Sequence, residues 1–233
     1  MANLTGPERA RYVQGMFARI AHRYDLMNRL MTFGRDVRWR VEVIRRAELA
    51  GEARLLDLGA GTGDLAKEAL RQHPDCRAVA ADFTLQMMRV GQRRWHSERL
   101  DWLAADAMAL PFSEAIFDAV VSGFLLRNVS DIAAALGEQH RLLKPGGRIV
   151  ALDTTRPRQS VFTPLIDFHL HTIIPTLGGW ISGSGEAYRY LPDSTENFLT
   201  AEGLAERMIS AGFSQVSFLR LMFGTVAIHW GVK

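Results

Sequence analysis

The stretch LLDLGAGTGDLA, residues 55–66, decides how this chain is expected to fold. Its leucines around Asp57 suit a short strand that is buried on both faces. Three glycines follow at intervals of two, and glycine lets the backbone turn tightly and approach a ligand without a clash at Cβ. A helix that begins near Thr62 would turn free backbone N–H groups toward that ligand. The stretch therefore predicts a nucleotide-shaped turn between a buried strand and a helix.

The spacing of the glycines distinguishes two kinds of nucleotide site. A dinucleotide fingerprint reads G-x-G-x-x-G, whereas Gly59, Gly61 and Gly63 form G-x-G-x-G with Asp57 ahead of them. A pyrophosphate is anionic and would be repelled by Asp57, while the same carboxylate suits the cationic methionyl end of S-adenosylmethionine. The turn favours S-adenosylmethionine as the cofactor. A dinucleotide site and a purely structural glycine turn are the alternatives.

Acidic residues also end the next two predicted strands. CRAVAADF ends a second buried strand at Asp82, just before Phe83, and a carboxylate there can accept hydrogen bonds from both ribose hydroxyls. LDWLAAD ends a third strand at Asp106, which with Ala107 offers an acceptor and a backbone N–H to an adenine ring. A lone Asp after a strand is usually a turn former or a helix cap. Three strand ends of this kind in succession favour a ligand site.

The remainder of the chain alternates strands and helices. Strand-like apolar segments lie near 54–58, 78–82, 100–104, 117–122 and 147–153. This alternation predicts a parallel, doubly wound α/β sheet. KPGG, Lys144–Gly147, is expected to end the fourth helix and lead into the strand RIVALD.

The C-terminal segment predicts an antiparallel addition to this sheet. A helix is expected near 200–211, followed by apolar runs at 215–221 and 225–230 that suit a closing hairpin. Such a hairpin distinguishes methyltransferases from ordinary dinucleotide folds. The expected fold is therefore Rossmann-like, of the class I S-adenosylmethionine-dependent methyltransferases, with a mostly parallel seven-stranded sheet.

Length and composition suit one compact domain, because the chain has 233 residues of which 48% are hydrophobic. We expect an N-terminal helical cap over 1–50, a cofactor-binding core over 51–155, an insertion over 156–197, and the closing helix and hairpin over 198–233. The insertion mixes large apolar residues with prolines and glycines. That mixture fits a lid over the substrate or a structural cap on the sheet.

Several classes of protein are disfavoured by composition. Cys76 is the single cysteine, so an internal disulfide framework and a cysteine zinc cluster are excluded and a reducing cytoplasm is the natural setting. The seven histidines form no spaced cluster, and we expect no metal. No stretch has the length of a membrane span, and no secretory segment begins the chain. No dense basic run with interleaved aromatics suggests nucleic-acid binding. The oligomeric state stays open.

Positive charge is concentrated in the N-terminal quarter. Residues 1–54 contain eleven Arg and six acidic residues, so their formal charge is 11 − 6 = +5, against +3 for the whole chain. Apolar side chains recur there at helical spacing among arginines, at Tyr12, Val13, Met16, Phe17 and Ile20. This basic amphipathic helix either packs its apolar face on the domain or lies on an anionic membrane surface.

Several motifs together resemble those of the ubiquinone and menaquinone biosynthesis C-methyltransferases. The resemblance covers nearly the whole chain. It is carried by YDLMNRLMTFGRDVRW at 24–39, LDLGAGTGD at 56–64, ALPF at 109–112, FLLRNVSD at 124–131, RLLKPGGRIVALD at 141–153 and YRYL at 188–191. The glycine turn and KPGG occur in many methyltransferases, whereas YD-x-MN and LRNV-D together are specific to this family.

The resemblance implies methyl transfer from S-adenosylmethionine to a ring carbon of a polyprenyl hydroquinone. The cofactor positions of the family carry over to Thr62, Asp82, Asp106 and Ala107. Gly123 also falls at a cofactor position, but the family commonly has Ser there. Two further departures are Asp36, where His is usual, and Asp153, where Glu is usual. A polyprenyl substrate implies work at the inner face of a membrane by an otherwise cytoplasmic protein.

Candidate catalytic residues follow from the chemistry and from the resemblance. A phenol has a pKa near about 10, so forming a phenolate at neutral pH needs a base or a fixed positive charge. Arg127 is expected to stabilise that phenolate and Asn128 to orient an oxygen, although such a pair is also common as a loop anchor. The N-terminal Tyr24, Asp25 and Asn28 are expected to close over the cofactor, with Asp25 as a proton relay. Their partner on the substrate side is Tyr188 in the expected lid.

Two other functions remain open for the sequence. One is a methyltransferase of the same fold that acts on a soluble phenol, and the other is a scaffold that binds the cofactor without catalysis. Retention of both Arg127 and Asn128 argues against the scaffold. Sequence does not separate a naphthoquinol from a benzoquinol substrate.

Overall fold

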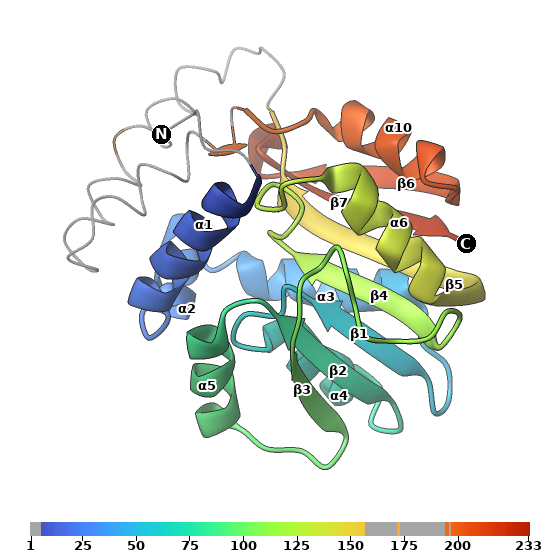
Figure 1. The fold of residues 1–233 in the computed structure, drawn as a ribbon, viewed down its shortest axis with the longest axis horizontal. Coiled ribbons are helices and arrows are strands. Elements are labelled where there is room, and N and C mark those ends of the chain that lie inside the picture. Colours follow the sequence, from blue (N-terminus) through green and yellow to red (C-terminus); the bar gives the residue numbers. More distant parts are fainter. Residues whose placement is uncertain (1–5, 157–171, 173–193, 196) are drawn as a thin grey trace.

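Seven strands form the centre of the molecule. A computed structural model describes residues 6–156, 172, 194, 195 and 197–233. Its strands are β1 (Arg54–Leu58), β2 (Arg77–Asp82), β3 (Leu100–Ala104), β4 (Phe117–Gly123), β5 (Leu143–Thr154), β6 (Ser214–Leu221) and β7 (Val226–Val232). They join in one sheet in the order β3-β2-β1-β4-β5-β7-β6, as Figure 1 shows.

The direction of the strands confirms the predicted fold class. β1 pairs in parallel with β2 and β4, β2 with β3, and β4 with β5. β7 is antiparallel to both β5 and β6. The parallel, doubly wound sheet and the closing antiparallel hairpin are therefore both present. The hairpin turns at η2 (Met222–Gly224), where Phe223 and Gly224 interrupt the apolar pattern.

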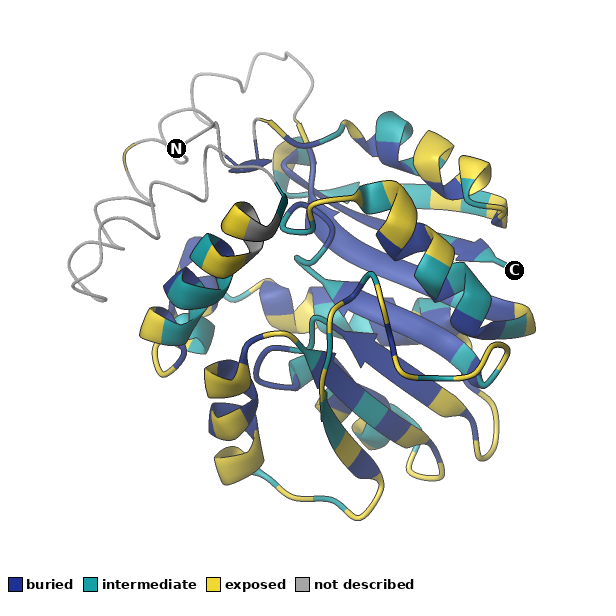
Figure 2. Ribbon diagram, in the orientation of Figure 1, coloured by how far each residue is buried: buried dark blue, intermediate teal, exposed yellow. Residues whose placement is uncertain are grey.

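Helices cover both faces of this sheet. They are α1 (Gly6–Ile20), α2 (Tyr24–Met31), α3 (Asp36–Ala47), α4 (Asp64–Gln72), α5 (Leu85–Arg94), α6 (Ile132–Leu142) and α10 (Ala201–Ser210). In Figure 1, α6 and α10 lie in front of the sheet, and α3 and α4 lie behind it. Successive strand residues point to opposite faces, so Leu55 packs with α3 and α4 while Leu56 packs with α6 and α10. Figure 2 shows the buried strands between these two layers.

The predicted role of KPGG was wrong. α6 ends at Leu142, and the chain already pairs with β4 at Leu143, so Lys144–Gly147 lies within β5 and does not end the helix. The register shifts there, because Phe117 pairs with Leu143 while Ala119 pairs with Arg148. Extra residues on one strand form a bulge. A positive φ of 78° at Gly146 allows the backbone to make it.

The N-terminal quarter folds as three helices against the rest of the chain. Val13, Met16 and Ile20 of α1 are buried, as the packing interpretation of this amphipathic helix predicted. α1 lies beside α5, at the side of the sheet where Figure 1 also places α2. Most of the expected lid, 156–197, lies outside the described residues.

Gly91 lets α5 approach the glycine turn more closely than any other residue type would. A Cβ at this position would lie 2.6 Å from the carbonyl oxygen of Thr62 and 2.4 Å from the ring of Trp102. Native Cβ atoms do not approach backbone atoms so closely. The size of residue 91 therefore sets the distance between α5 and the glycine turn.

Replacing Gly91 by alanine tests this close approach. Overpacking of a tight contact costs about 1–3 kcal/mol, so Gly91→Ala is expected to lower the free energy of unfolding by about 2 kcal/mol in a urea titration. Gly137→Ala is the control, because Gly137 lies inside α6 with nothing within 4 Å of its added Cβ. Alanine there is expected to raise the free energy of unfolding by about 0.5–1 kcal/mol. Stability changes of the same sign in the two variants would contradict the assignment.

Candidate active site

The glycine turn follows β1 and is fastened to β2. Gly59, Gly61 and Gly63 have φ angles of 68°, 58° and 81°, a region that residues with a Cβ rarely adopt. The backbone N–H of Gly59 donates to the carbonyl of Ala81 at 2.8 Å. The N–H of Gly61 donates to the carboxylate of Asp82 at 2.7 Å. The predicted turn is present, and bonds to the neighbouring strand hold it.

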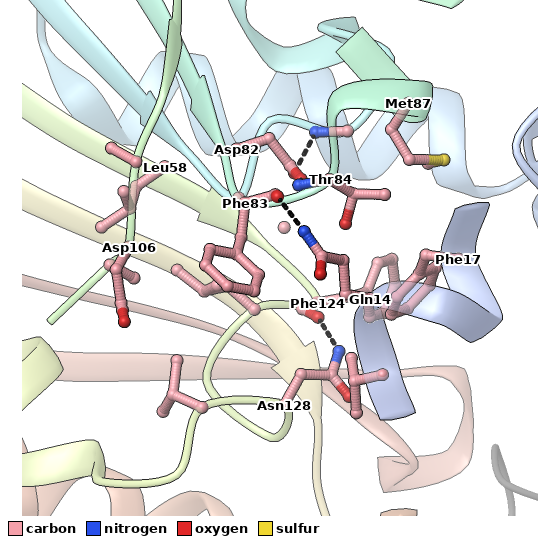
Figure 3. A pocket seen from close by; sticks show the side chains of 18 of the residues that line it. Gln14, Phe17, Leu58, Asp82, Phe83, Thr84, Met87, Asp106, Phe124 and Asn128 are labelled. Atoms are coloured by element: carbon pink, nitrogen blue, oxygen red, sulfur yellow. Dashed lines mark hydrogen bonds between the residues drawn. The ribbon is translucent and has the colours of Figure 1, made fainter. Parts of the chain in front are cut away.

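Two adjoining pockets open along this turn. The larger has an open volume of about 860 Å³ and the smaller of about 450 Å³. They share one wall, made by Tyr24, Gly59, Gly61, Gly123 and Phe124. Because the wall is common, the pockets suit the two ends of one elongated ligand. Figure 3 shows the larger pocket.

The larger pocket holds the residues expected to bind a nucleoside. Asp82, Phe83, Asp106 and Ala107 all line it. Asp82 accepts the N–H of Gly61 through one oxygen and the N–H of Thr84, at 2.6 Å, through the other. A carboxylate has about four lone-pair sites, so both oxygens can still accept hydrogen bonds from ribose hydroxyls.

Asp82 and Asp106 differ in their surroundings. Burial raises the pKa of the Asp82 carboxyl, and its backbone hydrogen bonds oppose that rise. Asp106 is exposed and accepts the N–H of Met108 at 2.9 Å. Ala107 beside it is buried. The adenine end of the pocket therefore combines an open carboxylate with an apolar floor.

Asp57 lies in the wall of the smaller pocket. It is 1% exposed, and its Oδ2 accepts the N–H of Ala66 at 2.9 Å, so it fixes the first turns of α4. Among the described residues, its Oδ1 has no hydrogen-bond partner. Burial raises the pKa of the Asp57 carboxyl to about 7. A cationic ligand in this pocket would favour the ionised carboxylate.

Arg40 faces the same pocket, and the sequence analysis did not assign it. Its guanidinium contacts Asp36 at 2.9 Å and Asp64 at 2.7 Å, and it lines the smaller pocket together with Asp57. A cation beside an anion suits the zwitterionic methionyl group of S-adenosylmethionine. The i, i+4 spacing of Asp36 and Arg40 was the available signal.

α2 closes the shared wall of the two pockets. Tyr24 lines both pockets and Asn28 lines the smaller one. Burial raises the pKa of the Tyr24 hydroxyl above 10, although a hydrogen bond with the Asn28 side chain and the charge of Arg127 oppose the rise. Tyr24 therefore stays protonated at neutral pH and acts as a hydrogen-bond donor. It is unsuited to be the base.

Asp25 lies outside both pockets. Its carboxylate accepts the hydroxyl proton of Thr62 at 2.9 Å and pairs with Arg94 of α5. It thus ties α2 to the glycine turn and to α5 at the same time. This geometry favours a positioning role, and Asp25 reaches the smaller pocket only through Thr62, which lines it. The proton relay expected from the sequence stays a prediction.

Two glycines differ in their relation to the pockets. Gly63 lines neither one and is the N-cap of α4, where a Cβ would lie 2.5 Å from the ring of Trp102. Gly123 lines both, and a Cβ there would lie 3.3 Å from the Cδ1 of Leu65, the end of a flexible side chain. The Ser usual in the family would need only a small shift of Leu65.

Tyr188 lies outside the described residues.

Arg127 and Asn128 lie in the loop after β4. Asn128 lines the larger pocket and donates from its side chain to the carbonyl of Phe124 at 2.8 Å (Figure 3). Phe124 has a positive φ of 58°, an uncommon conformation for a residue with a Cβ. Asn128 thus helps to hold a strained residue in the shared wall. The anchoring interpretation and the orienting interpretation are compatible in this geometry.

Arg127 is buried and lines a separate cavity with residues of α6 and α10. The backbone N–H of Arg127 donates to the carboxylate of Asp153 at 3.3 Å, and the side-chain Nε of Arg127 lies 3.9 Å from the same carboxylate. Burial raises the pKa of Asp153, and the charge of Arg127 opposes this. The guanidinium carbon of Arg127 lies 5.1 Å from the centroid of the Phe124 ring, which is part of the shared wall.

Part of the larger pocket comes from α1, which the sequence analysis did not assign to the site. Val13, Gln14 and Phe17 line it. The Gln14 side chain donates to the carbonyl of Phe83 at 2.8 Å, across 69 residues of sequence. Phe17 packs edge-on against Tyr24, with ring centroids 5.7 Å apart. The amphipathic pattern was visible in the sequence, but nothing in it indicated which surface the helix covers.

Comparison with known proteins identifies the family. A model of the ubiE/COQ5 methyltransferase family matches residues 5–233. The chain belongs to this family. A ubiquinone/menaquinone biosynthesis C-methyltransferase UbiE from Desulfotalea psychrophila is 44% identical over 221 residues, 95% of this chain and 90% of that protein. A demethylmenaquinone methyltransferase from Thermus thermophilus is 44% identical over 218 residues, 93% of this chain and 99% of that protein.

Solved structures agree on the fold. A SAM-dependent methyltransferase from Thermotoga maritima aligns with a TM-score of 0.65 at 19% identity, over 94% of this chain and 98% of the other. At that identity the likeness shows the fold alone. Family membership goes further, and S-adenosylmethionine is the methyl donor of this C-methyltransferase. The dinucleotide alternative is thereby excluded.

The pKa of Asp57 predicts how cofactor affinity depends on pH. Its folded pKa of about 7 means that the carboxyl is mostly protonated at lower pH. S-adenosylmethionine is cationic at its sulfur, so it should bind the ionised form better and release a proton below that pKa. Between about pH 5.5 and about pH 7.5, the dissociation constant is expected to fall at least about tenfold. Calorimetry in buffers of different ionisation enthalpy would count the released proton.

Asp57→Asn is the matched variant for this titration. It keeps the acceptor for the Ala66 N–H and removes the charge, so affinity should be lower and no longer vary with pH in that range. S-adenosylhomocysteine, which lacks the sulfonium charge, should show a weaker dependence in the wild-type protein. An unchanged pH profile in Asp57→Asn would assign the titration to another group.

Proposed function

We propose that the chain transfers a methyl group from S-adenosylmethionine to a ring carbon of a polyprenyl hydroquinone. The reaction would convert demethylmenaquinol to menaquinol, or methylate the corresponding benzoquinol in ubiquinone biosynthesis. The names of the relatives support this substrate class. The structural observation that carries the proposal is the buried Arg127, whose guanidinium carbon lies 5.1 Å from the ring centroid of Phe124 in the wall that the two pockets share.

Transfer of the methyl group to a ring carbon requires a negatively charged, electron-rich substrate. Loss of the hydroquinone O–H proton gives a phenolate, whose ring carbon attacks the methyl group while the sulfur–carbon bond breaks. S-adenosylhomocysteine leaves, and the ring carbon then loses its proton to restore the aromatic ring. A phenol has a pKa near about 10. Arg127 would lower that value by stabilising the phenolate in a site of low dielectric.

The roles of the wall residues follow from their protonation states. Tyr24 keeps its proton and can donate to the developing phenolate, while Asn28 accepts from or donates to Tyr24. Among the described residues that line the two pockets there is no histidine. We propose water as the acceptor of the hydroxyl proton. Positioning and electrostatics supply the rate enhancement.

A polyprenyl tail also determines where the enzyme works. The tail belongs in the bilayer, so a cytoplasmic enzyme meets its substrate at the inner membrane face. Among the described residues, no helix is long and apolar enough to cross a membrane. We therefore propose peripheral contact with the membrane.

The direct test is product analysis. The protein is incubated with S-adenosylmethionine and chemically reduced demethylmenaquinone, beside the demethylated methoxy-benzoquinone precursor, and products are followed by mass spectrometry. A product heavier by one methylene is expected, with higher kcat/KM for substrates that carry a prenyl tail. Turnover of soluble phenols alone would redirect the assignment to a small-molecule methyltransferase. Cofactor binding without any turnover would indicate a scaffold.

A variant of Arg127 tests the proposed electrostatic role. Arg127→Gln removes the positive charge beside Asp153 and keeps a polar side chain that can donate hydrogen bonds. We expect kcat at neutral pH to fall about a hundredfold. The loss should be smaller near about pH 9.5, where more of the phenol ionises unaided. Arg71→Gln, the same change at an exposed arginine on α4, is the control and should leave kcat unchanged. A loss in Arg127→Gln that is equal at both pH values would refute stabilisation of the phenolate.

A further inference from the structure

One corner of the molecule exposes an unusual series of large apolar side chains. Leu26 and Leu30 of α2 are 54% and 37% exposed, Phe33 in the following turn is 67% exposed, and Val37 at the start of α3 is 40% exposed. Single exposed apolar residues are normal on protein surfaces. Here four of them fall within twelve residues, on α2, the turn after it and the start of α3.

α2 therefore has two different faces. Met27, Asn28 and Met31 are buried, and Asn28 lines the smaller pocket. Leu26 and Leu30 lie on the exposed side of the same eight-residue helix. Burial of a helix normally needs only one apolar face. The second face has no role in forming the pockets.

The turn between α2 and α3 keeps Phe33 at the surface. Phe33 has a positive φ of 53° and is followed by Gly34 with a φ of 72°. The N–H of Gly34 donates to the carbonyl of Arg29 at 2.7 Å and closes the end of α2. A bulky residue rarely adopts a positive φ without a reason. The backbone at Phe33 is therefore strained although the Phe33 side chain is exposed to solvent.

Arginines surround these apolar side chains. Arg23, Arg29, Arg35 and Arg38 are all exposed. The two acidic residues between positions 22 and 38 are paired within the chain. Asp25 pairs with Arg94, and Asp36, which is 2% exposed, pairs with Arg40 and lies 3.7 Å from the Nε of Arg29. The surface of this corner is therefore apolar and positively charged.

We propose that this α2–α3 corner, Leu26, Leu30, Phe33 and Val37 with Arg23, Arg29, Arg35 and Arg38, docks on an anionic membrane surface. The apolar side chains would enter the boundary between headgroups and acyl chains, and the arginines would contact lipid phosphates. The proposal gives the membrane contact of the proposed function a location. α1 is not this element, since its apolar Val13, Met16 and Ile20 are already buried.

Charge also favours a membrane over a second copy of the chain. A two-fold dimer would place the same patch against itself. Four arginines would then face four arginines, with the nearby acidic groups already paired. An anionic lipid surface complements the same charges. The corner is also close to the site, because α2 carries Tyr24 and Asn28 on its other face.

The test is sedimentation of the full-length protein with vesicles, without substrate. Vesicles of phosphatidylcholine with roughly 30% phosphatidylglycerol are compared with pure phosphatidylcholine. Binding to the anionic vesicles is expected, with a severalfold loss between about 50 mM and about 200 mM salt. Leu26→Ser with Phe33→Ser, and separately Arg35→Glu with Arg38→Glu, are each expected to weaken partitioning at least about tenfold.

Matched changes elsewhere on the surface serve as controls. Ile209→Ser with Leu219→Ser removes two side chains that are 59% and 40% exposed on α10 and β6. This control should partition within about twofold of the wild type. Circular dichroism and cofactor affinity should be unchanged in every variant, because none of these residues lines the two pockets.

The outcomes separate this inference from the proposed function. Wild-type protein that ignores anionic vesicles, or patch variants that bind them as well as the wild type, would overturn the docking surface. A patch variant that changes the mass measured by light scattering, without vesicle binding in the wild type, would assign the corner to a second copy. Turnover of a short-chain quinol is measured in solution without vesicles. Turnover without vesicle binding would support the proposed function and refute the docking surface, and vesicle binding without turnover would do the opposite.

Discussion

The approach of α5 to the glycine turn is the constraint on which the site depends. Gly91 brings α5 against the Thr62 carbonyl, and the ring of Trp102 fills the space beneath Gly63. On the other side, Asp82 and the end of β2 hold the turn by hydrogen bonds. The turn therefore has its shape before a ligand arrives. A preformed site loses little conformational entropy on binding, which matters because the cofactor must be exchanged in every catalytic cycle.

Three buried carboxylates in and near the site differ in the groups that stabilise their negative charge. Burial raises the pKa of Asp57, Asp82 and Asp153 alike, but each has a different compensating partner. Backbone N–H groups support Asp82, and Arg127 supports Asp153. Asp57 accepts one backbone hydrogen bond, and among the described residues its other oxygen has no hydrogen-bond partner. A cationic ligand therefore stabilises the ionised form of Asp57 more than that of the other two. The methyl donor is a sulfonium and the product a neutral thioether, and this difference favours entry of the first and release of the second.

The sequence predicted the elements of this fold well and the contacts of the site only in part. Strand periodicity and the glycine turn located β1 to β4 and the closing hairpin, because these features are local. KPGG failed because a Pro-Gly run ends a helix or forms a bulge equally well, and pairing with β4 decided the matter. Gln14 escaped notice because its partner, the carbonyl of Phe83, is distant in the sequence. Arg40 has a local partner in Asp36, but its place in the pocket wall depends on tertiary contacts. Asp25 was placed in the right segment, but its contacts with Thr62, which lines the smaller pocket, and with Arg94 of α5 were not predicted, because both partners are distant in the sequence.

A short helix that is both pocket wall and outer surface has a physical advantage for a lipid substrate. Each methylene withdrawn from an apolar phase into water costs about 0.8 kcal/mol, so one five-carbon prenyl unit costs several kcal/mol to expose. Moving the whole tail into water would therefore cost more free energy than binding of the ring could supply. A helix with its side chains is about 10–12 Å across. With the α2–α3 corner on the bilayer, the ring would need to rise only about that far to reach Tyr24, while most of the tail stayed among the acyl chains.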